Sequence, residues 1–329
     1  MRRREFITLL GGAAIASPVL WPLPLNAQQK PWTIGFMGAG AADTSAPLLE
    51  AVRQGLRENG LVEGKDVVLE PRWAEGHYER FAAHARELTE QGARAIIVTT
   101  IAACRAAQRA TSVIPIIMAN LNDPAGSGLV ASLSRPGGNT TGLATLAQDV
   151  TPKLLEFLHI VLPNAKTVAA LFNPANPSNL VFLDKVRVQA SPLGIKVQDF
   201  ALKAPGELDA AFDAIASQRA DAVLVIPDAA TLDLGTRIAA LQLQHRLPVV
   251  STDSDLTSAG GLISYGTSRR ENYRRSAYFV KKVLDGVKPA DLPVEQPTRI
   301  LLSLNLATAK VLGLAIPPTM IVRADEVIE

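Results

Sequence analysis

The stretch TIGFMGAGAADTSAPLLEAVRQGLRENG, residues 33–60, decides the fold class of this chain. It opens with a short apolar run at residues 33–37, which is typical of a buried strand. Residues 47–59 then carry leucine and valine at helical spacing, with Ser45 before them as a possible cap and Gly60 after them as a stop signal. A buried strand that leads into an amphipathic helix indicates a parallel α/β sheet.

The same alternation of strands and helices recurs along the chain in two series. In the first series, further strands are expected at 67–70, 95–98 and 114–118, with helices at 78–91 and 102–110. In the second series, strands are expected at 168–172, 196–200, 222–226 and 248–250, with helices at 180–190, 208–217 and 234–246. Because continuous apolar strands need cover on both faces, each series predicts a doubly wound parallel sheet, and thus one lobe of a two-lobe α/β protein.

A stretch rich in glycine, asparagine and threonine, residues 139–151, separates the two series. After the second series, a further helix is expected at 271–284 and a further strand at 300–304. We expect these segments to return the chain to the first lobe and then to the second, so that three strands form the hinge. The ligand cleft then lies between two lobes with these bounds: lobe 1 is residues 31–145 plus 265–290, and lobe 2 is residues 146–264 plus 291–329.

The composition limits the classes of function that the chain can have. Of 329 residues, 48% are hydrophobic and 19% are charged, which suffices for two buried cores. The net charge of +2 resides in the first 27 residues, and basic and acidic residues balance in the rest. A neutral body argues against nucleic acid as a partner, because phosphate binding needs a concentrated basic face. The single cysteine, Cys104, excludes an intramolecular disulfide and a cysteine-rich zinc site.

The first 27 residues have the layout of an export signal. Three arginines, at residues 2–4, precede a short apolar run at residues 8–16, and Ala27 offers a cleavage point. The paired arginines resemble a twin-arginine signal, and the general secretory route stays open as the alternative. An uncleaved membrane anchor is disfavoured, because the apolar run is shorter than the ~20 residues that a spanning helix needs. We therefore expect a periplasmic protein that is cut after Ala27.

In open parallel sheets, ligands bind at the carboxyl ends of the strands. Small, amide or hydroxyl residues follow six such ends, including Asn120 and Asp123 after one of them; the six segments are 38–45, 99–102, 119–124, 173–178, 227–231 and 251–255. Asp228 and Asp253 are the candidates for pairing with a ligand ammonium group. Tyr265 follows an apolar pair and fits the cleft or the core equally well. Ordinary helix capping explains any single one of these residues as well, so the prediction rests on the six ends together.

Enzymatic signatures are missing from the sequence. It has no phosphate-binding P-loop and no glycine-flanked serine nucleophile, and Asp43 stands where a dinucleotide fingerprint needs its third glycine. Four histidines are scattered, and Cys104 lies in an apolar helix that fits a core residue better than a nucleophile. We therefore expect no catalytic residue, no metal and no cofactor. An exported enzyme on the same two-lobe scaffold stays the rival interpretation.

Several motifs, in their order along the chain, resemble those of the substrate-binding proteins of ABC importers, in the family that includes the tryptophan- and tyrosine-associated binding proteins. The resemblance runs nearly from end to end. Its motifs are RREFITLLGGAA at 3–14, RWAEG at 72–76, DP at 123–124, SRPGGN at 134–139, NPANP at 173–177, GGLISYGTS at 260–268, PADLP at 289–293, PP at 317–318 and RADEVIE at 323–329.

The resemblance implies a type I periplasmic-binding fold whose two lobes close on a small solute. It also implies delivery of the solute to a membrane permease driven by an ATPase, and we expect the protein to act as a monomer. In such relatives, strand ends of the first lobe present N–H and hydroxyl groups to a ligand carboxylate; the matching positions here are Ala39, Gly40, Thr99, Thr100 and Ala102. The second lobe contributes the remaining positions, which are Asn173, Asn176, Ser178 and Asp228.

Two stretches at the expected cleft depart from the family pattern. Residues 101–103 are Ile-Ala-Ala, where relatives usually have a small residue and a proline. Residues 253–256 are Asp-Ser-Asp-Leu, where an aromatic residue and an arginine are frequent. The solute is therefore not fixed by the resemblance, and amino acids, aromatic acids and other small carboxylates all stay open.

Overall fold

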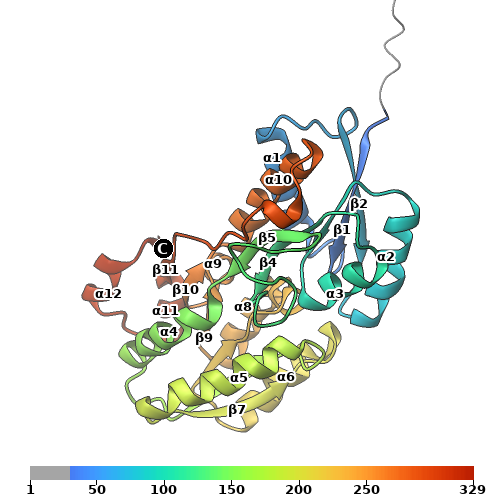
Figure 1. Ribbon diagram of the computed structural model, residues 1–329. Coiled ribbons are helices and arrows are strands. Elements are labelled where there is room, and N and C mark those ends of the chain that lie inside the picture. The colour runs from blue at the N-terminus through green and yellow to red at the C-terminus, as the bar shows by residue number, and fades with distance from the viewer. Residues whose placement is uncertain (1–29) are drawn as a thin grey trace, which may run out of the picture. The chain divides into compact units, whose positions relative to one another are not determined.

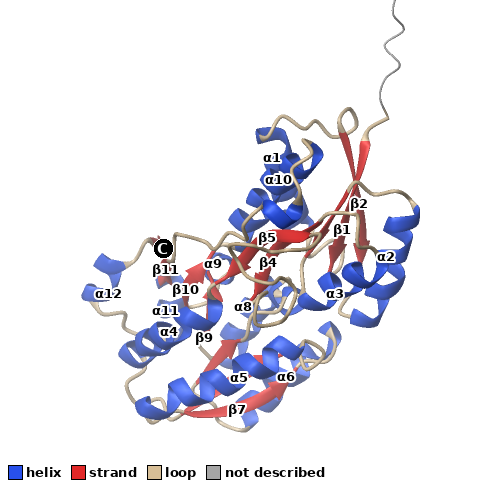
Figure 2. Ribbon diagram, viewed as in Figure 1, coloured by secondary structure: helices blue, strands red, loops and turns tan. Residues whose placement is uncertain are grey.

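The computed structural model describes residues 30–329, and the expected export signal at residues 1–27 lies outside them. In this part of the chain the strands form two separate sheets, of five and seven strands (Figure 1). Helices pack on both faces of each sheet (Figure 2). We call the five-stranded sheet with its helices the first lobe, and the seven-stranded sheet with its helices the second lobe. The expected α/β class with two lobes is confirmed.

The first lobe is a fully parallel sheet in the order β2-β1-β3-β4-β5. Its strands are β1 (Trp32–Gly38), β2 (Val67–Trp73), β3 (Ala95–Val98), β4 (Ile116–Asn122) and β5 (Thr140–Thr145). Its helices are α1 (Ala46–Glu58), the 3-10 turn η1 (Tyr78–Arg80), α2 (Phe81–Glu90), α3 (Ile101–Ala110), α10 (Arg269–Leu284) and the 3-10 turn η4 (Pro289–Asp291). Apolar side chains of α1 and α10 bury one face of the sheet, and those of α2 and α3 bury the other.

The second lobe has the strand order β12-β11-β10-β9-β8-β6-β7. Its strands are β6 (Thr167–Phe172), β7 (Lys196–Ala201), β8 (Ala222–Val225), β9 (Val249–Asp253), β10 (Ile263–Thr267), β11 (Leu301–Asn305) and β12 (Glu326–Ile328). Its helices are α4 (Ala147–Val161), α5 (Pro177–Ala190), α6 (Leu208–Ser217), α7 (Ala229–Leu232), α8 (Gly235–His245), α9 (Ser254–Ser258), α11 (Leu306–Leu312) and α12 (Pro318–Arg323), with 3-10 turns η2 (Ser191–Leu193) and η3 (Pro205–Glu207). Side chains of α4 and α5 fill one face and those of α6 and α8 the other.

One strand pair of the second lobe is antiparallel, although the sequence pattern predicts parallel strands throughout. β10 pairs with β9 in parallel and with β11 antiparallel. β10 ends where the chain leaves for the first lobe, and β11 begins where the chain returns from it. Two neighbouring strands that share the hinge end in this way must run in opposite directions. The exception therefore follows from the triple crossing of the hinge.

The three crossings lie at Leu146, at Ser268 and at residues 296–300. Two expected lobe bounds differ from these positions. Strand β10 stays in the second lobe as far as Thr267, whereas we expected the return from residue 265. On the way back, Glu295 still forms a bridge with Leu143 of β5, because its N–H and C=O pair with the backbone at that edge of the first sheet.

The stretch 139–151, expected as a plain separator, contains β5 and the start of α4. The threonines of β5 are buried although they are polar, because their hydroxyls have partners. Gln108 donates to Thr140 Oγ1 at 2.9 Å, and Thr141 donates to the Leu292 carbonyl at 2.7 Å. A strand whose burial depends on such distant partners lacks the apolar run that marks the other strands.

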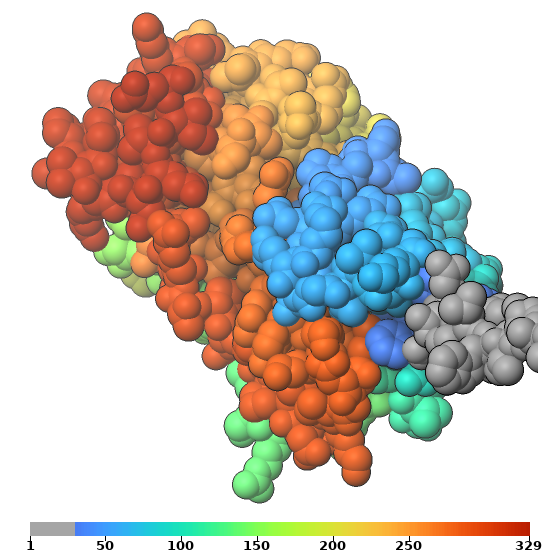
Figure 3. All heavy atoms as spheres, turned by 90° about the horizontal axis from the view of Figure 1, so that it is seen from above, coloured from blue at the N-terminus to red at the C-terminus, as the bar shows by residue number. Residues whose placement is uncertain are grey.

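Helices α1 and α10 lie side by side, although more than 200 residues separate them in sequence. Figure 3 shows this contact as a blue surface next to an orange one. Gly55 of α1 permits the close approach, since a Cβ there would lie 2.9 Å from the Ala277 Cβ of α10. In residues 30–329, no helix has both the length and the apolar character needed to cross a bilayer.

Candidate functional site

A small cavity lies where strand ends and helix starts of the two lobes meet. Its volume is about 40 Å³. Polar side chains dominate its lining, which consists of Thr99, Thr100, Ile101, Asn120, Leu121, Asn122, Thr145, Arg269 and Tyr273 from the first lobe and Asn176, Ser178, Pro227, Asp228, Ala229 and Leu232 from the second. This is the arrangement that a doubly wound sheet produces, because helix N-termini and strand carboxyl ends lie at the same edge.

Asp228 is the carboxylate of this cavity. It lies just after β8, caps the short helix α7, and is 3% exposed. Oδ1 accepts from Asn173 Nδ2 at 3.1 Å and from the Thr231 N–H at 3.4 Å, while Oδ2 accepts from Asn176 Nδ2 at 2.8 Å. The fourth donor is Tyr78 of the first lobe, whose hydroxyl lies 2.6 Å from Oδ2. All four donors are neutral groups, so no side-chain cation pairs with this buried carboxylate among residues 30–329.

A second buried carboxylate, Asp233, follows the other end of α7. Ser45 donates a hydrogen bond to it from the start of α1. Arg269, at the start of α10, places Nη1 at 2.7 Å from Asp233 Oδ1 and Nε at 2.9 Å from Asp253 Oδ2. The three side chains of this ion cluster are only 4–8% exposed. Asp233 thus ties the second lobe to α1 and α10 of the first.

Gly40 leaves the space that the contact between Asp233 and Ser45 needs. A Cβ on Gly40 would overlap the carboxylate of Asp233 and would lie 2.7 Å from Ser45 Oγ. A side chain of any size at this position therefore conflicts with the approach of Asp233 to Ser45.

The buried groups of the site have shifted pKa values. Burial raises the pKa of Asp233, against the opposing effect of Arg269. Burial also raises the pKa of Asp253 to about 7, with the neighbouring Asp255 adding to the effect. Burial and the adjacent Asp228 carboxylate raise the pKa of Tyr78 well above its ordinary value, so its hydroxyl keeps its proton and donates it.

Two helix N-termini point donors into the cavity. Thr100 caps α3, with its Oγ1 accepting from the Ala103 N–H at 3.1 Å. Asn176 caps α5 in the second lobe, with Oδ1 accepting from the Ser178 N–H at 3.2 Å and from the Ser178 hydroxyl at 2.7 Å. At α5 these N–H groups are all engaged, because residue 177 is a proline and Asn176 binds the N–H groups of Ser178 and Asn179. At α3 the first two N–H groups, of Ile101 and Ala102, keep no acceptor among residues 30–329, and free N–H groups of this kind favour an anionic ligand group.

Two further hollows continue the cavity along the line where the lobes meet. A groove of about 300 Å³ shares Ile101 with the cavity and is walled by Tyr78, Phe81 and Ala102 from the first lobe and by Pro177 from the second. A hollow of about 200 Å³ on the other side shares Asn122 and Thr145 with the cavity. The small central cavity therefore sits between two larger spaces.

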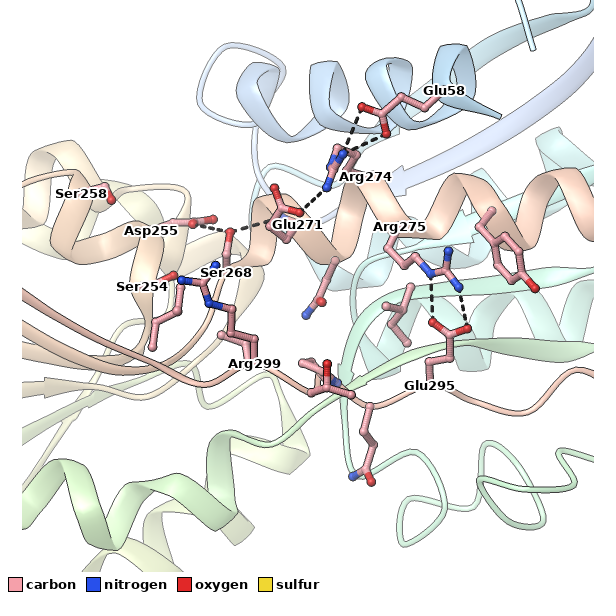
Figure 4. A pocket seen from close by; sticks show the side chains of 18 of the residues that line it. Glu58, Ser254, Asp255, Ser258, Ser268, Glu271, Arg274, Arg275, Glu295 and Arg299 are labelled. Atoms are coloured by element: carbon pink, nitrogen blue, oxygen red, sulfur yellow. Dashed lines mark hydrogen bonds and ion pairs between the residues drawn. The ribbon is translucent and has the colours of Figure 1, made fainter. Parts of the chain in front are cut away.

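The largest hollow, about 660 Å³, lies at the hinge segments (Figure 4). Two of its three arginines, Arg274 and Arg275, are paired with carboxylates. Arg275 forms two parallel hydrogen bonds to Glu295, at 2.9 and 3.0 Å, and Arg274 bonds to Glu58 of α1. These pairs fix α10 to α1 and fix the third crossing to α10. We interpret this hollow as part of the hinge, because residues 295–299, at the third crossing between the lobes, line it.

Metal binding has no support in the described part of the chain. Residues 30–329 contain no group of three or more histidine, cysteine or acidic side chains placed to hold an ion. Cys104 is buried, and burial raises the pKa of its thiol to about 12, so it is an unreactive core residue.

Comparison with known families identifies the class of protein. The sequence pattern of the family described as ABC transporter substrate binding protein matches residues 43–328. The chain belongs to this family. Proteins of this family are the components of ABC transporters that bind a small-molecule solute and interact with the permease.

Individual relatives agree with the family assignment. A tyrosine-binding protein of Clostridioides difficile is 23% identical over 273 residues, which is 82% of this substrate-binding protein and 78% of the relative. Among solved structures, an ABC domain of Streptococcus pneumoniae in complex with L-Trp has a TM-score of 0.80 at 24% identity, covering 91% of this chain and 100% of that one. A conserved domain protein of Vibrio cholerae reaches 0.82 at 23% identity with the same two coverages. These likenesses show the type I periplasmic-binding fold.

The substrate-binding protein brings some of the predicted site residues together and not others. The cavity is lined by Thr99, Thr100, Asn120, Asn176, Ser178 and Asp228. Asn173 donates a hydrogen bond to Asp228 from outside the cavity lining. Gly40 lies next to the contact between Asp233 and Ser45. Ala102 lines the groove of about 300 Å³.

Four predicted residues lie elsewhere. Ala39 is buried in the core of the first lobe. Asp123 is exposed at the rim of the 200 Å³ hollow and accepts from the Gly126 N–H. Asp253 pairs with Arg269 and caps α9, so it holds the ion cluster rather than facing the cavity. Tyr265 packs edge-on against Phe157, with ring centroids 5.2 Å apart, because its strand turns that face toward α4.

The sequence patterns missed four residues of the site. Tyr78, Asp233 and Tyr273 stand further from a strand end, so the search of strand ends passed over them. Arg269 stands two residues after β10, a strand that is not in either expected series. A weak signal existed for Asp233, which stands in the mostly apolar stretch IPDAATLDLG together with Asp228. A charge in such a stretch indicates a buried partner. The partner, Arg269, is 36 residues away and belongs to the other lobe.

Proposed function

We propose that this substrate-binding protein is exported to the periplasm and serves an ABC importer. In this proposal it captures a small solute between its lobes as a monomer, and it delivers the solute unaltered to a permease powered by an ATPase. The single observation that carries the proposal is Asp228, a buried carboxylate on the cavity that no side-chain cation of residues 30–329 neutralises. A buried charge of this kind is costly unless a ligand compensates it.

The proposed solute bears an ammonium group and a carboxylate. Asp228 pairs with the ammonium, and the N–H groups at the N-terminus of α3 take the carboxylate. Thr100, the cap of α3, lines the cavity beside them. An amino acid, aromatic or not, has both groups. The ligands of two relatives, tyrosine and L-Trp, support this solute class.

Hinge closure is the proposed mechanism of capture. A solute that contacts both lobes at once favours the closed arrangement by the difference between its affinities for the closed and open forms. Contacts such as Tyr78 to Asp228 and Ser45 to Asp233 already join the lobes here. The fold likeness is greater with the L-Trp complex, at a TM-score of 0.80, than with a ligand-free, open structure from Clostridium difficile, at 0.60 and 22% identity, which supports a closed arrangement.

Mass spectrometry of the solute that co-purifies with the native protein tests the proposal. We expect a small molecule with a primary amine, retained by the wild type and released on unfolding. Asp228→Asn should retain at least about tenfold less of it, because an amide cannot neutralise an ammonium and a hydrogen-bonded charge contributes this much or more. Asp291→Asn is the matched control, since Asp291 is exposed and lines none of the hollows between the lobes.

Two outcomes would contradict the proposal. One is a retained molecule that lacks any amine, and the other is a wild-type protein that converts the retained molecule into a product. Equal retention by Asp228→Asn would remove Asp228 from the binding site.

A further inference from the structure

The carboxylate of Asp228 has no free acceptor position. A carboxylate offers about four lone-pair positions on its two oxygens. In Asp228, Oδ1 receives Asn173 and the Thr231 N–H, and Oδ2 receives Asn176 and Tyr78. A solute ammonium that binds Asp228 must therefore displace one of these four donors.

Three of the four donors are held by the second lobe's own structure. Asn176 is the N-cap of α5, and its Oδ1 is engaged with Ser178. Asn173 Oδ1 accepts from the Ala175 N–H, and its own N–H is bound by Asn179. The Thr231 N–H belongs to the backbone of α7. Removing any of them from Asp228 breaks local structure that does not depend on the first lobe.

The fourth donor, Tyr78, comes from the first lobe, and its side chain lies beside a space into which it can move. Its ring is 9% exposed and packs on Phe81, with centroids 5.3 Å apart. The ring also walls the groove of about 300 Å³ that lies beside the central cavity of about 40 Å³. A rotation of this side chain into the groove would leave the second lobe's own hydrogen bonds to Asp228 in place.

We propose that Tyr78 is a specificity-determining residue whose hydroxyl occupies the ammonium position on Asp228 until a cationic solute group displaces it. This inference rests on the proposed function. In the absence of solute, the hydroxyl holds the lobes together through Asp228. On binding, the solute's charged donor takes Oδ2, and the aromatic ring moves into the adjoining groove.

The exchange selects solutes by charge. A neutral hydroxyl or amide that replaces the phenol trades one neutral donor for another and gains nothing at Asp228. A protonated amine instead brings a full positive charge to the carboxylate, so the hydrogen bond becomes an ion pair and gains the attraction between opposite charges. The surrounding charges favour the same choice, since three buried carboxylates, Asp228, Asp233 and Asp253, face one buried guanidinium, Arg269. Tyr78 thus excludes polyols and favours amines.

The first arm of the test measures closure without any solute. Spin labels at Val113→Cys in the first lobe and Val188→Cys in the second lie at positions that are 84% and 74% exposed. Native Cys104 stays unlabelled because it is buried. After the protein is stripped by unfolding and refolded, we expect a population with a short distance between labels in the wild type. Tyr78→Phe should shrink this population about tenfold, the contribution of one hydrogen bond to a charged group.

The second arm measures binding of L-tryptophan, L-tyrosine and 3-indolepropionate, which lacks the amine, by calorimetry. Tyr78→Phe should bind the two amino acids at least as tightly as the wild type, because the competitor is gone. The wild type should bind 3-indolepropionate at least about tenfold more weakly than L-tryptophan. Tyr265→Phe, the same chemical change in the core of the second lobe, is the control that should alter neither closure nor affinity.

Each contrary result has a distinct meaning. If the distance between the spin labels in solute-free Tyr78→Phe is the same as in the wild type, the proposed role of Tyr78 in holding the lobes together is overturned. A variant that binds both amino acids more weakly, in proportion to its lost closure, shows that Tyr78 stays on Asp228 in the complex and overturns the exchange. If no variant binds either amino acid, the amino-acid part of the proposed function fails, while the solute-free distances still decide the role of Tyr78.

Discussion

The two carboxylates at the ends of α7 differ in where their partners come from. Asp228 receives three donors from its own lobe and one, Tyr78, from the other. Asp233 receives its hydrogen bonds from Ser45 and Arg269, both in the first lobe. Asp228 is therefore satisfied largely without closure, whereas Asp233 depends on it. This difference assigns them different tasks: Asp233 joins the lobes, and Asp228 is available for exchange with a solute.

Of the variants considered, Arg269→Met should have the largest effect, because it removes the partner of Asp233 and leaves the partners of Asp228 in place. It leaves Asp233 and Asp253 buried without their cation, which costs about 3–5 kcal/mol in the free energy of unfolding. Urea unfolding measures the loss, and Arg270→Met, the exposed neighbour, should cost less than about 0.5 kcal/mol.

The same variant should show a characteristic pH dependence. Burial raises the pKa of both acids, and without Arg269 it should raise them further. An acid with a raised pKa in the folded state binds more protons there than in the unfolded state, so stability falls as the pH rises between its two pKa values. The loss relative to the wild type should therefore be larger at pH 8 than at pH 5. An equal loss at both values would contradict the account of the ion cluster.

Gly40→Ala should test the role of Asp233 separately from that of Asp228. The new methyl group conflicts with the Asp233 carboxylate and Ser45 Oγ, so it opposes closure by about 1–3 kcal/mol, in the range of overpacked sites. We expect the short distance between the labels at 113 and 188 to be lost while each lobe stays folded. Gly206→Ala is the control, since no atom lies within 4 Å of its Cβ position. A Gly40→Ala protein that closes normally would contradict the role of Asp233.

The helix caps of the two lobes offer the smallest expected effect. Thr100→Ala removes the cap of α3 and should cost about 1 kcal/mol in the free energy of unfolding. Asn176→Ala removes the cap of α5 and also a donor to Asp228, so it should cost more in the free energy of unfolding. Both residues line the cavity, so both variants should also weaken solute binding, which calorimetry measures separately from chemical unfolding. Equal costs in the free energy of unfolding would mean that the amide of Asn176 contributes nothing at Asp228.

The sequence predicts the strands and helices well where apolar residues decide them. β3 and β8 are fully buried runs of alanine, valine, isoleucine or leucine, and both were expected. β5 was missed because its threonines are buried through partners at Gln108 and Leu292, which no local pattern reveals. The strand β11 was expected at residues 300–304, but its antiparallel direction was not, because strand direction depends on where the chain re-enters the sheet.

In the candidate site, too, local patterns predict some residues, whereas partners that are distant in sequence decide the others. Asp228 and Asp253 are equivalent in sequence, since each stands near the end of a strand and caps a helix. They differ in their partners: Tyr78 of the first lobe and two asparagines of the second bind Asp228, whereas Arg269 of the first lobe pairs with Asp253. Tyr78 is 150 residues from Asp228, and Ser45 is 188 residues from Asp233. Pairings over such separations are set by how the two lobes meet, so local sequence patterns do not contain them.

Small-angle X-ray scattering of the protein with its co-purified solute and after stripping tests the central claim most directly. The account predicts a smaller radius of gyration with solute, and a larger difference in Tyr78→Phe, because the stripped variant should open further. An identical radius with and without solute, while mass spectrometry confirms that the site is occupied, would contradict capture by closure of the two lobes.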